Sequence, residues 1–490
     1  MKEKGGKGMK TRKSRACEVR YHEYLTILQE RPAFRKAFDE TCREFQINQE
    51  SRMPLDSRLY LMVFAPALVS FVNWVMEQAV MTGKDRLYFL SRDGYQMYLI
   101  ARQLAAYKDM AIECRYLHVS RYSMRLPGYH LNMERCLDSI CVGGIDVTPL
   151  KILRRGGLTE QECGNVIREL HLKETQDKVM NYRQVQLLRE RLVKSDMLRQ
   201  YIQKHSMEAY DNAIGYLKQE GLCRDGRFAI VDSGWVGTLQ CAIEALIQSV
   251  SPEIKVEGYY FGMYEYPRGA ERDWFHTYLF SLERGLARKA YFSNSLFETV
   301  VSAAEGTTMA YGLEGGKYYP ILREQKNPNA GQLAQNAEAL QLYLKYLLPE
   351  KGTRGTEEYD MMADNKKFIA ELMKKFMSEP TALEYECYGK NLFSDDVTDE
   401  DQKKAAADLT RKEIRDQRLL QKLLIMTGIK KAVIRESAWL EGSAFGTLGE
   451  GRKLLFELRH IRLYKGFVSF RKLCACQILV SMCARTRAKV

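Results

Sequence analysis

Acidic, basic and glycine residues follow two apolar stretches of this 490-residue chain. The first stretch, residues 86–90, is followed by Ser91, Arg92, Asp93 and Gly94, and the second, residues 228–231, is followed by the segment 232–238. An amphipathic helical pattern comes after each of them, which is typical of a strand-to-helix junction. Because the loops at the carboxyl ends of parallel strands converge on one crevice, we expect both junctions to form a single ligand site.

The first junction has the groups that bind a phosphate. A helix start at Ser91 and Gly94 offers backbone N–H donors and close approach, and Arg92 adds a compensating positive charge. Asp93 could be a catalytic nucleophile or base, or a ligand for Mg²⁺. A Ser or Asp before Gly is also a common helix cap, so capping remains an alternative for this loop.

The second junction repeats this pattern and adds an aromatic residue. Asp232 directly follows the predicted strand 228–231, and it could act in catalysis or bind Mg²⁺ together with Asp93. Trp235 could stack on a sugar or a base. In the alternative reading, Trp235 belongs to the core and Asp232 is a cap. The small residues of this loop are expected to hold an anion: Gly234, Gly237 and Thr238.

Two further segments extend the candidate substrate site. The predicted strand 114–119 contains His118 and is followed by Arg121, whose forked guanidinium suits a phosphate. His118 could be an acid or base, although a lone His near a strand is commonly a packed residue. Glu298 and Glu305 flank a small-residue stretch and could bind sugar hydroxyls or a metal.

The order of these elements predicts an α/β fold with a Rossmann-like parallel sheet, a helical insertion and a helical C-terminal region. We expect a buried helix over 59–81 rather than a membrane span, a helix over 20–48, and a hairpin over 309–322 that turns at Gly315 and Gly316. The predicted organisation is a disordered basic tail at 1–20, a core at 21–330 with an insertion at 122–222 that could cover the site, a helical region at 331–450, and a basic amphipathic segment at 451–490.

The net charge of +13 is concentrated at the two ends of the chain. Residues 1–15 contribute +6 and residues 452–490 contribute +9, so the rest is almost neutral. This distribution, with no nucleic-acid-reading motif, argues against a specific nucleic-acid partner. The basic ends could be solvated tails or could contact anionic lipids, and residues 473–484 have the length of an interfacial helix.

Twelve cysteines in a chain of this length are too few for a disulfide scaffold, and the N-terminus has no apolar signal region. The expected location is therefore the cytoplasm, with possible peripheral contact at the inner face of the membrane.

The motifs around Ser91–Gly94, Arg121, Asp232 and Glu298 resemble those of predicted hydrolases of the haloacid dehalogenase superfamily that accompany bacterial surface-polysaccharide glycosyltransferases. The resemblance covers roughly residues 58–425. It implies an enzyme, or an enzyme-derived domain, that acts on a phosphorylated or nucleotide-linked sugar, with a glycosyltransferase as a possible partner. The phosphatases have an Asp-x-Asp pair, which both junctions of this chain lack. The residue two positions after Asp93 is Tyr95, and the residue two positions after Asp232 is Gly234. The phosphatase mechanism is therefore not carried over.

The two junctions are also similar, more loosely, to type I phosphoribosyltransferases, in which one loop holds pyrophosphate and a later one wraps a ribose 5-phosphate. The segment 232–238 has one acidic residue where that pattern usually has two. A phosphoribosyltransferase-like enzyme and a non-catalytic accessory protein of a membrane-associated glycosyltransferase are the alternative functions.

Overall fold

A computed structural model of the protein describes residues 12–142, 146–348, 360, 363–394, 402–427, 429–432 and 434–487.

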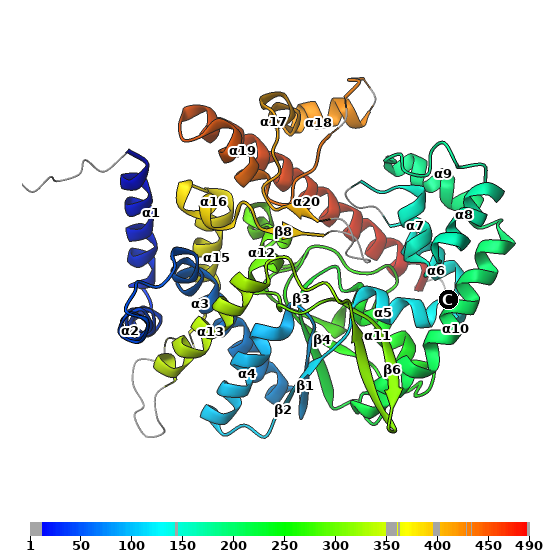
Figure 1. Ribbon diagram of the computed structural model, residues 1–490, viewed down its shortest axis with the longest axis horizontal. Coiled ribbons are helices and arrows are strands. Elements are labelled where there is room, and N and C mark those ends of the chain that lie inside the picture. The colour runs from blue at the N-terminus through cyan, green and yellow to red at the C-terminus, as the bar shows by residue number, and fades with distance from the viewer. Residues whose placement is uncertain are drawn as a thin grey trace, which may run out of the picture.

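Five parallel strands form the central sheet, in the spatial order β2-β1-β3-β4-β5 (Figure 1). With helices on both sides, this is the α/β, Rossmann-like architecture that the sequence predicts. The strand order reverses between β1 and β3, where ligands of open parallel sheets bind. The strands are β1 (Arg86–Leu90), β2 (Glu113–Leu117), β3 (Phe228–Trp235), β4 (Glu257–Met263) and β5 (Phe275–Phe280).

The alternating side chains of β1 enter two separate cores. Leu87 and Phe89 pack into the core that contains α3 (Leu55–Met81) and α4 (Gly94–Lys108), whereas Tyr88 and Leu90 pack on the opposite face. That second face is covered by α10 (Asp196–Gln219) and α11 (Thr238–Gln248). Because both faces are covered, the strands are continuously apolar rather than alternating.

Helix α3 is the one helix of the described residues with the length and hydropathy of a membrane span, and 94% of its apolar window is buried inside the protein. It is a core helix, as predicted from the polar residues that interrupt its sequence. Its aromatic side chains join the sheet to the C-terminal helices: Phe64 lies 5.0 Å from Phe376, 6.1 Å from Phe297 and 6.3 Å from Tyr388, measured between ring centroids.

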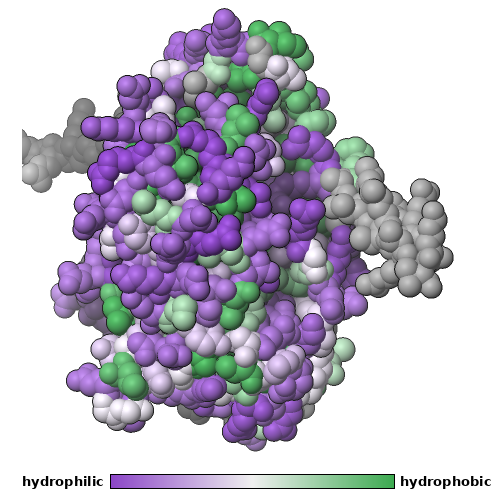
Figure 2. Space-filling view, turned by 90° about the vertical axis from the view of Figure 1, so that its right-hand side faces the viewer, coloured by the Kyte–Doolittle hydropathy of each residue, from purple (hydrophilic) through white to green (hydrophobic). Residues whose placement is uncertain are grey.

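The predicted insertion is helical and has a hydrophobic core of its own. The last helix of the insertion, α10, returns to the sheet. The side of the molecule on which the insertion lies is mainly hydrophilic, with scattered hydrophobic side chains (Figure 2). The remaining helices of the insertion are α5 (Arg121–Arg125), η1 (Leu126–Leu131), α6 (Met133–Ile140), α7 (Pro149–Arg155), α8 (Glu160–Glu169) and α9 (Tyr182–Leu192).

The C-terminal region is mostly helical, and its long last helix α20 crosses above the sheet towards the insertion (Figure 1). Between β5 and this region lie two short helices, η3 and α12, and the predicted hairpin, which does turn at Gly315 and Gly316. The elements that follow β4, apart from β5, are η2 (Arg272–Trp274), η3 (Leu286–Tyr291), α12 (Asn294–Val301), β6 (Thr308–Glu314), β7 (Lys317–Leu322), α13 (Ala330–Leu347), α15 (Lys366–Met373), η4 (Lys374–Ser378), α16 (Ala382–Tyr388), β8 (Leu392–Phe393), β9 (Lys403–Lys404), α17 (Arg411–Asp416), α18 (Leu419–Met426), α19 (Leu440–Leu448) and α20 (Arg452–Arg487).

Two predictions about the N-terminus need correction. The predicted disordered tail at 1–20 is too long, because helix α1 (Arg12–Leu28) begins at Arg12. Residues 1–11 of that predicted tail lie outside the described residues. The expected single helix over 20–48 is broken, and α2 (Pro32–Gln49) starts at Pro32 because proline has no N–H to continue a helix. At the other end, the side chains beyond Cys474, which include most of the expected interfacial segment, lie outside the described residues.

Replacing Phe64 by Ala should destabilise the sheet and the C-terminal helices together. Phe64 is fully buried, and loss of such a ring costs about 3–5 kcal/mol. Thermal unfolding should shift to lower temperature as one transition, whereas Val80→Ala, on the 58% exposed side chain of the same helix, should leave it unchanged. A C-terminal transition that stays at the wild-type temperature would contradict a shared core.

Candidate functional site

A cavity of about 300 Å³ lies at the carboxyl edge of the sheet. Residues that follow β1 and β2, the end of β3, helix α12 and the start of β6 all contribute to its wall. The two aspartates come from neighbouring strands on either side of the point where the strand order reverses. Ten of the side chains and glycines that the sequence singled out line this one cavity: Ser91, Arg92, Asp93, Arg121, Asp232, Gly234, Trp235, Gly237, Thr238 and Glu298.

Asp93 precedes the first residue of α4 but its carboxylate does not cap that helix. Instead, its Oδ2 accepts a hydrogen bond of 2.6 Å from the Ser233 hydroxyl, and Ser302 also hydrogen-bonds the carboxylate. The residue after Ser302 also anchors the loop that contains Asp93, because the Ala303 N–H donates a hydrogen bond of 3.0 Å to the Arg92 carbonyl. The capping alternative is therefore not adopted, and Asp93 faces the cavity.

Asp232 lies within β3 rather than after it, which corrects the predicted end of that strand at residue 231. Pairing with β4 continues as far as Trp235. The Asp232 carboxylate accepts hydrogen bonds from the N–H groups of Ser233 and Gly234. Gly234 has a φ of 107°, and a Cβ there would lie 2.7 Å from the Gly262 carbonyl oxygen, so only glycine fits this close approach.

Trp235 supports the third carboxylate. Its indole N–H donates to Glu298 Oε1 at 2.5 Å, and its ring is 8% exposed and packs against Phe280, Phe292 and Phe297. This packing agrees with the core alternative, and because Trp235 also lines the cavity, its stacking on a ligand stays a prediction. The role of Trp235 is to orient Glu298.

Burial raises the pKa of all three carboxyl groups, and the charge of Asp93 adds to the shift at Asp232 and Glu298. Burial, followed by the neighbouring charge of Asp93, raises the pKa of Asp232 to about 7 and that of Glu298 to about 8. Burial also raises the pKa of Asp93, although Ser233, Arg92 and Arg121 oppose the shift. Near neutral pH the set therefore titrates as a unit and retains at least one proton.

Three residues that the sequence proposed for substrate binding do not line the cavity: Gly94, His118 and Glu305. The His118 Nδ1 lies 3.3 Å from Glu305 Oε1, and the same oxygen accepts a hydrogen bond of 2.7 Å from the Tyr116 hydroxyl. Burial disfavours the Glu305 carboxylate, but its hydrogen bonds from His118 and Tyr116 prevail and lower its pKa. Gly94 has a packing role, because a Cβ there would lie 2.9 Å from the Phe89 backbone.

Other polar residues of the cavity wall were missed by the sequence analysis. Asn294 Oδ1 and Thr308 Oγ1 are buried and have no hydrogen-bond partner within the described parts of the chain. Isolated Asn and Thr residues carry no motif, so no sequence signal would have found them. The missed residues are Ser120, Ser233, Gln240, Tyr260, Tyr264, Asn294, Ser295, Thr307, Thr308 and Ser394.

The described residues contain no group of three or more His, Cys, Asp or Glu side chains arranged to hold a metal ion. Asp93 and Asp232 are the two carboxylates that could contact Mg²⁺ together with oxygens of a substrate. Their role as Mg²⁺ ligands stays a prediction.

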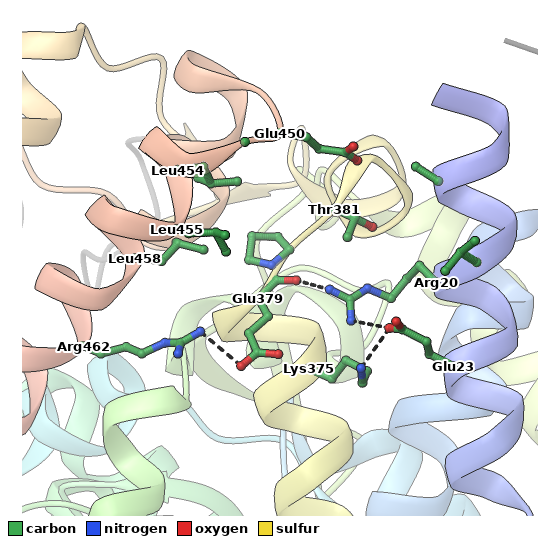
Figure 3. Close-up of a pocket in the computed structure, with 14 residues that line it drawn as sticks. Arg20, Glu23, Lys375, Glu379, Thr381, Glu450, Leu454, Leu455, Leu458 and Arg462 are labelled. Carbon is green, nitrogen blue, oxygen red and sulfur yellow. Dashed lines mark hydrogen bonds and ion pairs between the residues drawn. The ribbon is translucent and has the colours of Figure 1, made fainter. Parts of the chain in front are cut away.

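A larger cavity, of about 740 Å³, lies between α1 and α20 (Figure 3). Five of the six charged residues that line it are paired with each other: Glu23 accepts hydrogen bonds from Arg20 at 2.9 Å and from Lys375 at 2.8 Å, and Arg462 lies 3.2 Å from Glu379. Because these charges are already neutralised by protein groups, this cavity has the character of a structural junction.

Helix α20 also reaches the rim of the candidate site. The Lys472 ammonium lies 4.3 Å from the ring centroid of Tyr264, which lines the cavity, and 2.5 Å from the Glu265 carboxylate. Lys289 of η3 lies 5.0 Å from the same ring. The rim around Tyr264 therefore depends on the C-terminal helix.

Neither protein-family models nor curated proteins give a match to this chain.

The raised pKa of Glu298 predicts that stability falls as pH rises. Ionisation of a carboxyl group whose folded pKa exceeds its unfolded value is less favourable in the folded state, so the folded protein loses stability between the unfolded pKa near 4.5 and the folded value of about 8. Glu298→Gln keeps the acceptor for Trp235 and removes the charge. Its melting temperature relative to wild type should therefore rise on going from pH 5.5 to pH 8.5, by about 2–4 °C. A constant difference across this range, measured by calorimetry, would contradict the shift.

Proposed function

We propose that this chain is an enzyme that acts on a phosphorylated or nucleotide-linked sugar. The observation that supports this most strongly is the meeting of Asp93, Asp232 and Glu298, from three distant segments, with Arg92 and Arg121 around one cavity. Structural ion pairs have no need of three carboxylates with raised pKa values in a cleft, whereas acid–base catalysis does.

The arginines suit the charged part of such a substrate. Arg121 is exposed, and its charge lowers the pKa of all three carboxylates. Arg92 acts on Asp93 in the same way. A phosphate between these guanidinium groups would be held by charge-assisted hydrogen bonds, close to the N-termini of α4 and α11.

The carboxylates suit the reaction. With pKa values of about 7 for Asp232 and about 8 for Glu298, a protonated and an ionised carboxyl group coexist near neutral pH. One can donate a proton to a leaving oxygen while the other takes a proton from the attacking hydroxyl or water. Either hydrolysis or transfer would use this pair.

The uncharged wall suits a sugar. Asn294 Oδ1 and Thr308 Oγ1, buried without a partner among the described residues, can each accept a hydrogen bond from a sugar hydroxyl. The volume of about 300 Å³ is that of a small-molecule site. The context of bacterial surface-polysaccharide biosynthesis rests on the resemblance of the motifs to predicted hydrolases of the haloacid dehalogenase superfamily.

A phosphoribosyltransferase-like enzyme is the second candidate. The observation that favours it is the adjacency of β1 and β3, which brings the two strand-to-helix junctions to the same edge of the sheet. This candidate requires a phosphorylated pentose as substrate, so ligand specificity separates it from the first.

The test is calorimetric titration with glucose 1-phosphate, ribose 5-phosphate and nucleotide-linked sugars, followed by assays for phosphate or nucleotide release. Arg121→Gln should weaken binding at least tenfold, since a hydrogen bond to a charged group contributes about 1.5–3 kcal/mol. Asp232→Asn should retain binding and lower turnover by about 100-fold or more. Arg183→Gln, on an exposed residue outside the cavity wall, is the matched control. Binding that is insensitive to Arg121→Gln would refute the proposed site.

A further inference from the structure

A second cavity, of about 660 Å³, adjoins the candidate site and shares Thr238 and Gln240 with it. It is enclosed by the first helices of the insertion, α5, η1 and α6, on one side and by α11 and the start of β5 on the other. We infer that this cavity binds the nucleoside diphosphate portion of a nucleotide-linked sugar, whose sugar lies in the first cavity. The inference rests on the proposed function for the placement of the sugar.

The wall nearest to the shared residues is cationic and lacks an acidic partner. Arg125 donates from Nη2 to the Thr238 hydroxyl at 2.7 Å, and neither it nor Arg135 forms an ion pair with a carboxylate among the described residues. Burial, together with the positive charges of Arg121, Arg155 and Arg135, lowers the pKa of Arg125 to about 10. Arg155 donates hydrogen bonds to the carbonyls of Ile140 and Val142.

The acidic residues of this cavity do not form ion pairs with Arg125 or Arg135 in the described part of the chain. Asp138 lies 2.7 Å from Arg189, and Glu271 lies 3.6 Å from Lys255. Glu244 accepts a hydrogen bond of 3.3 Å from Gln248, and the charges of Lys255 and Arg135 favour its ionised form from a longer distance. The two guanidinium groups can therefore still pair with an anion from solution, and a diphosphate carries enough negative charge for both.

Aromatic side chains also contribute to the wall of this cavity. Tyr129, Trp274 and Phe275 line it, and Trp274 is only partly buried. Planar rings of this kind are the usual surface for a nucleobase, which a bare phosphate or a simple sugar phosphate lacks. Since Thr238 lies in the walls of both cavities, a diphosphate beside it would join a nucleoside in the second cavity to a sugar in the first.

The test is titration of the full chain with the diphosphates of uridine, cytidine, adenosine, guanosine and thymidine, with inorganic pyrophosphate and glucose 1-phosphate for comparison. At least one nucleoside diphosphate should bind tenfold or more tightly than pyrophosphate. Arg125→Gln and Arg135→Gln should each weaken that binding about tenfold, and Arg135→Gln, at a residue that lines only the second cavity, should leave glucose 1-phosphate binding unchanged. Arg183→Gln should alter neither. Because Arg135 is exposed, its variant tests the inference even if the Arg125 variant does not fold.

Two results would overturn the inference. One is that no nucleoside diphosphate binds more tightly than pyrophosphate. The other is that binding is lost in Arg121→Gln but unchanged in Arg125→Gln and Arg135→Gln, which would leave the proposed function intact and place the whole ligand in the first cavity. Conversely, loss of glucose 1-phosphate binding with retained nucleotide binding would count against the first site alone.

Discussion

Repulsion among three carboxylates is the constraint around which this molecule is organised. Asp93, Asp232 and Glu298 share a cleft in which burial disfavours the ionised form of each, and the charge of Asp93 further disfavours ionisation of the other two. They can remain together only because rigid elements hold them there. The parallel pairing of β1 with β3 fixes the two aspartates, and the indole of Trp235, packed among phenylalanine rings, fixes the glutamate.

The rest of the fold supplies that rigidity. Helix α3 lies buried against one face of the sheet and contacts the C-terminal helices through Phe64, so the C-terminal region stabilises the sheet. The insertion has a separate core and contributes cationic side chains, above all Arg125, beside the carboxyl edge. Acidic groups thus come from the sheet and α12, and basic groups come mainly from the loops and the insertion, an arrangement that leaves room for an anion between them.

Much of the fold follows from short-range patterns. The strand at 86–90, the buried helix at 59–81 and the hairpin with Gly315 and Gly316 have clear apolar runs or turn residues, and all three are present. The neighbourhood of Asp93 and Asp232 could also be foreseen, because parallel strands bring their carboxyl ends to one edge. Strand β5 was missed, since His276 and Thr277 interrupt its apolar pattern.

Other features depend on tertiary packing that no local pattern encodes. His118 and Glu305 were both assigned to the ligand site, yet they contact each other beside Tyr116 and do not line the cavity. Trp235 lines the cavity, but its packing against aromatic rings that are distant in the sequence could not be foreseen from a local pattern. The partnerless oxygens of Asn294 and Thr308 become visible only when the surrounding atoms are known.

The contact between Lys472 and Tyr264 has a practical consequence for anyone preparing this protein. A truncation that removes Lys472 takes away a group that holds the mouth of the cleft, even though the sheet is left whole. Bulky fusions are therefore better attached at the opposite end of the chain, and a shortened version that purifies well but binds no ligand would say little about the protein with α20 intact.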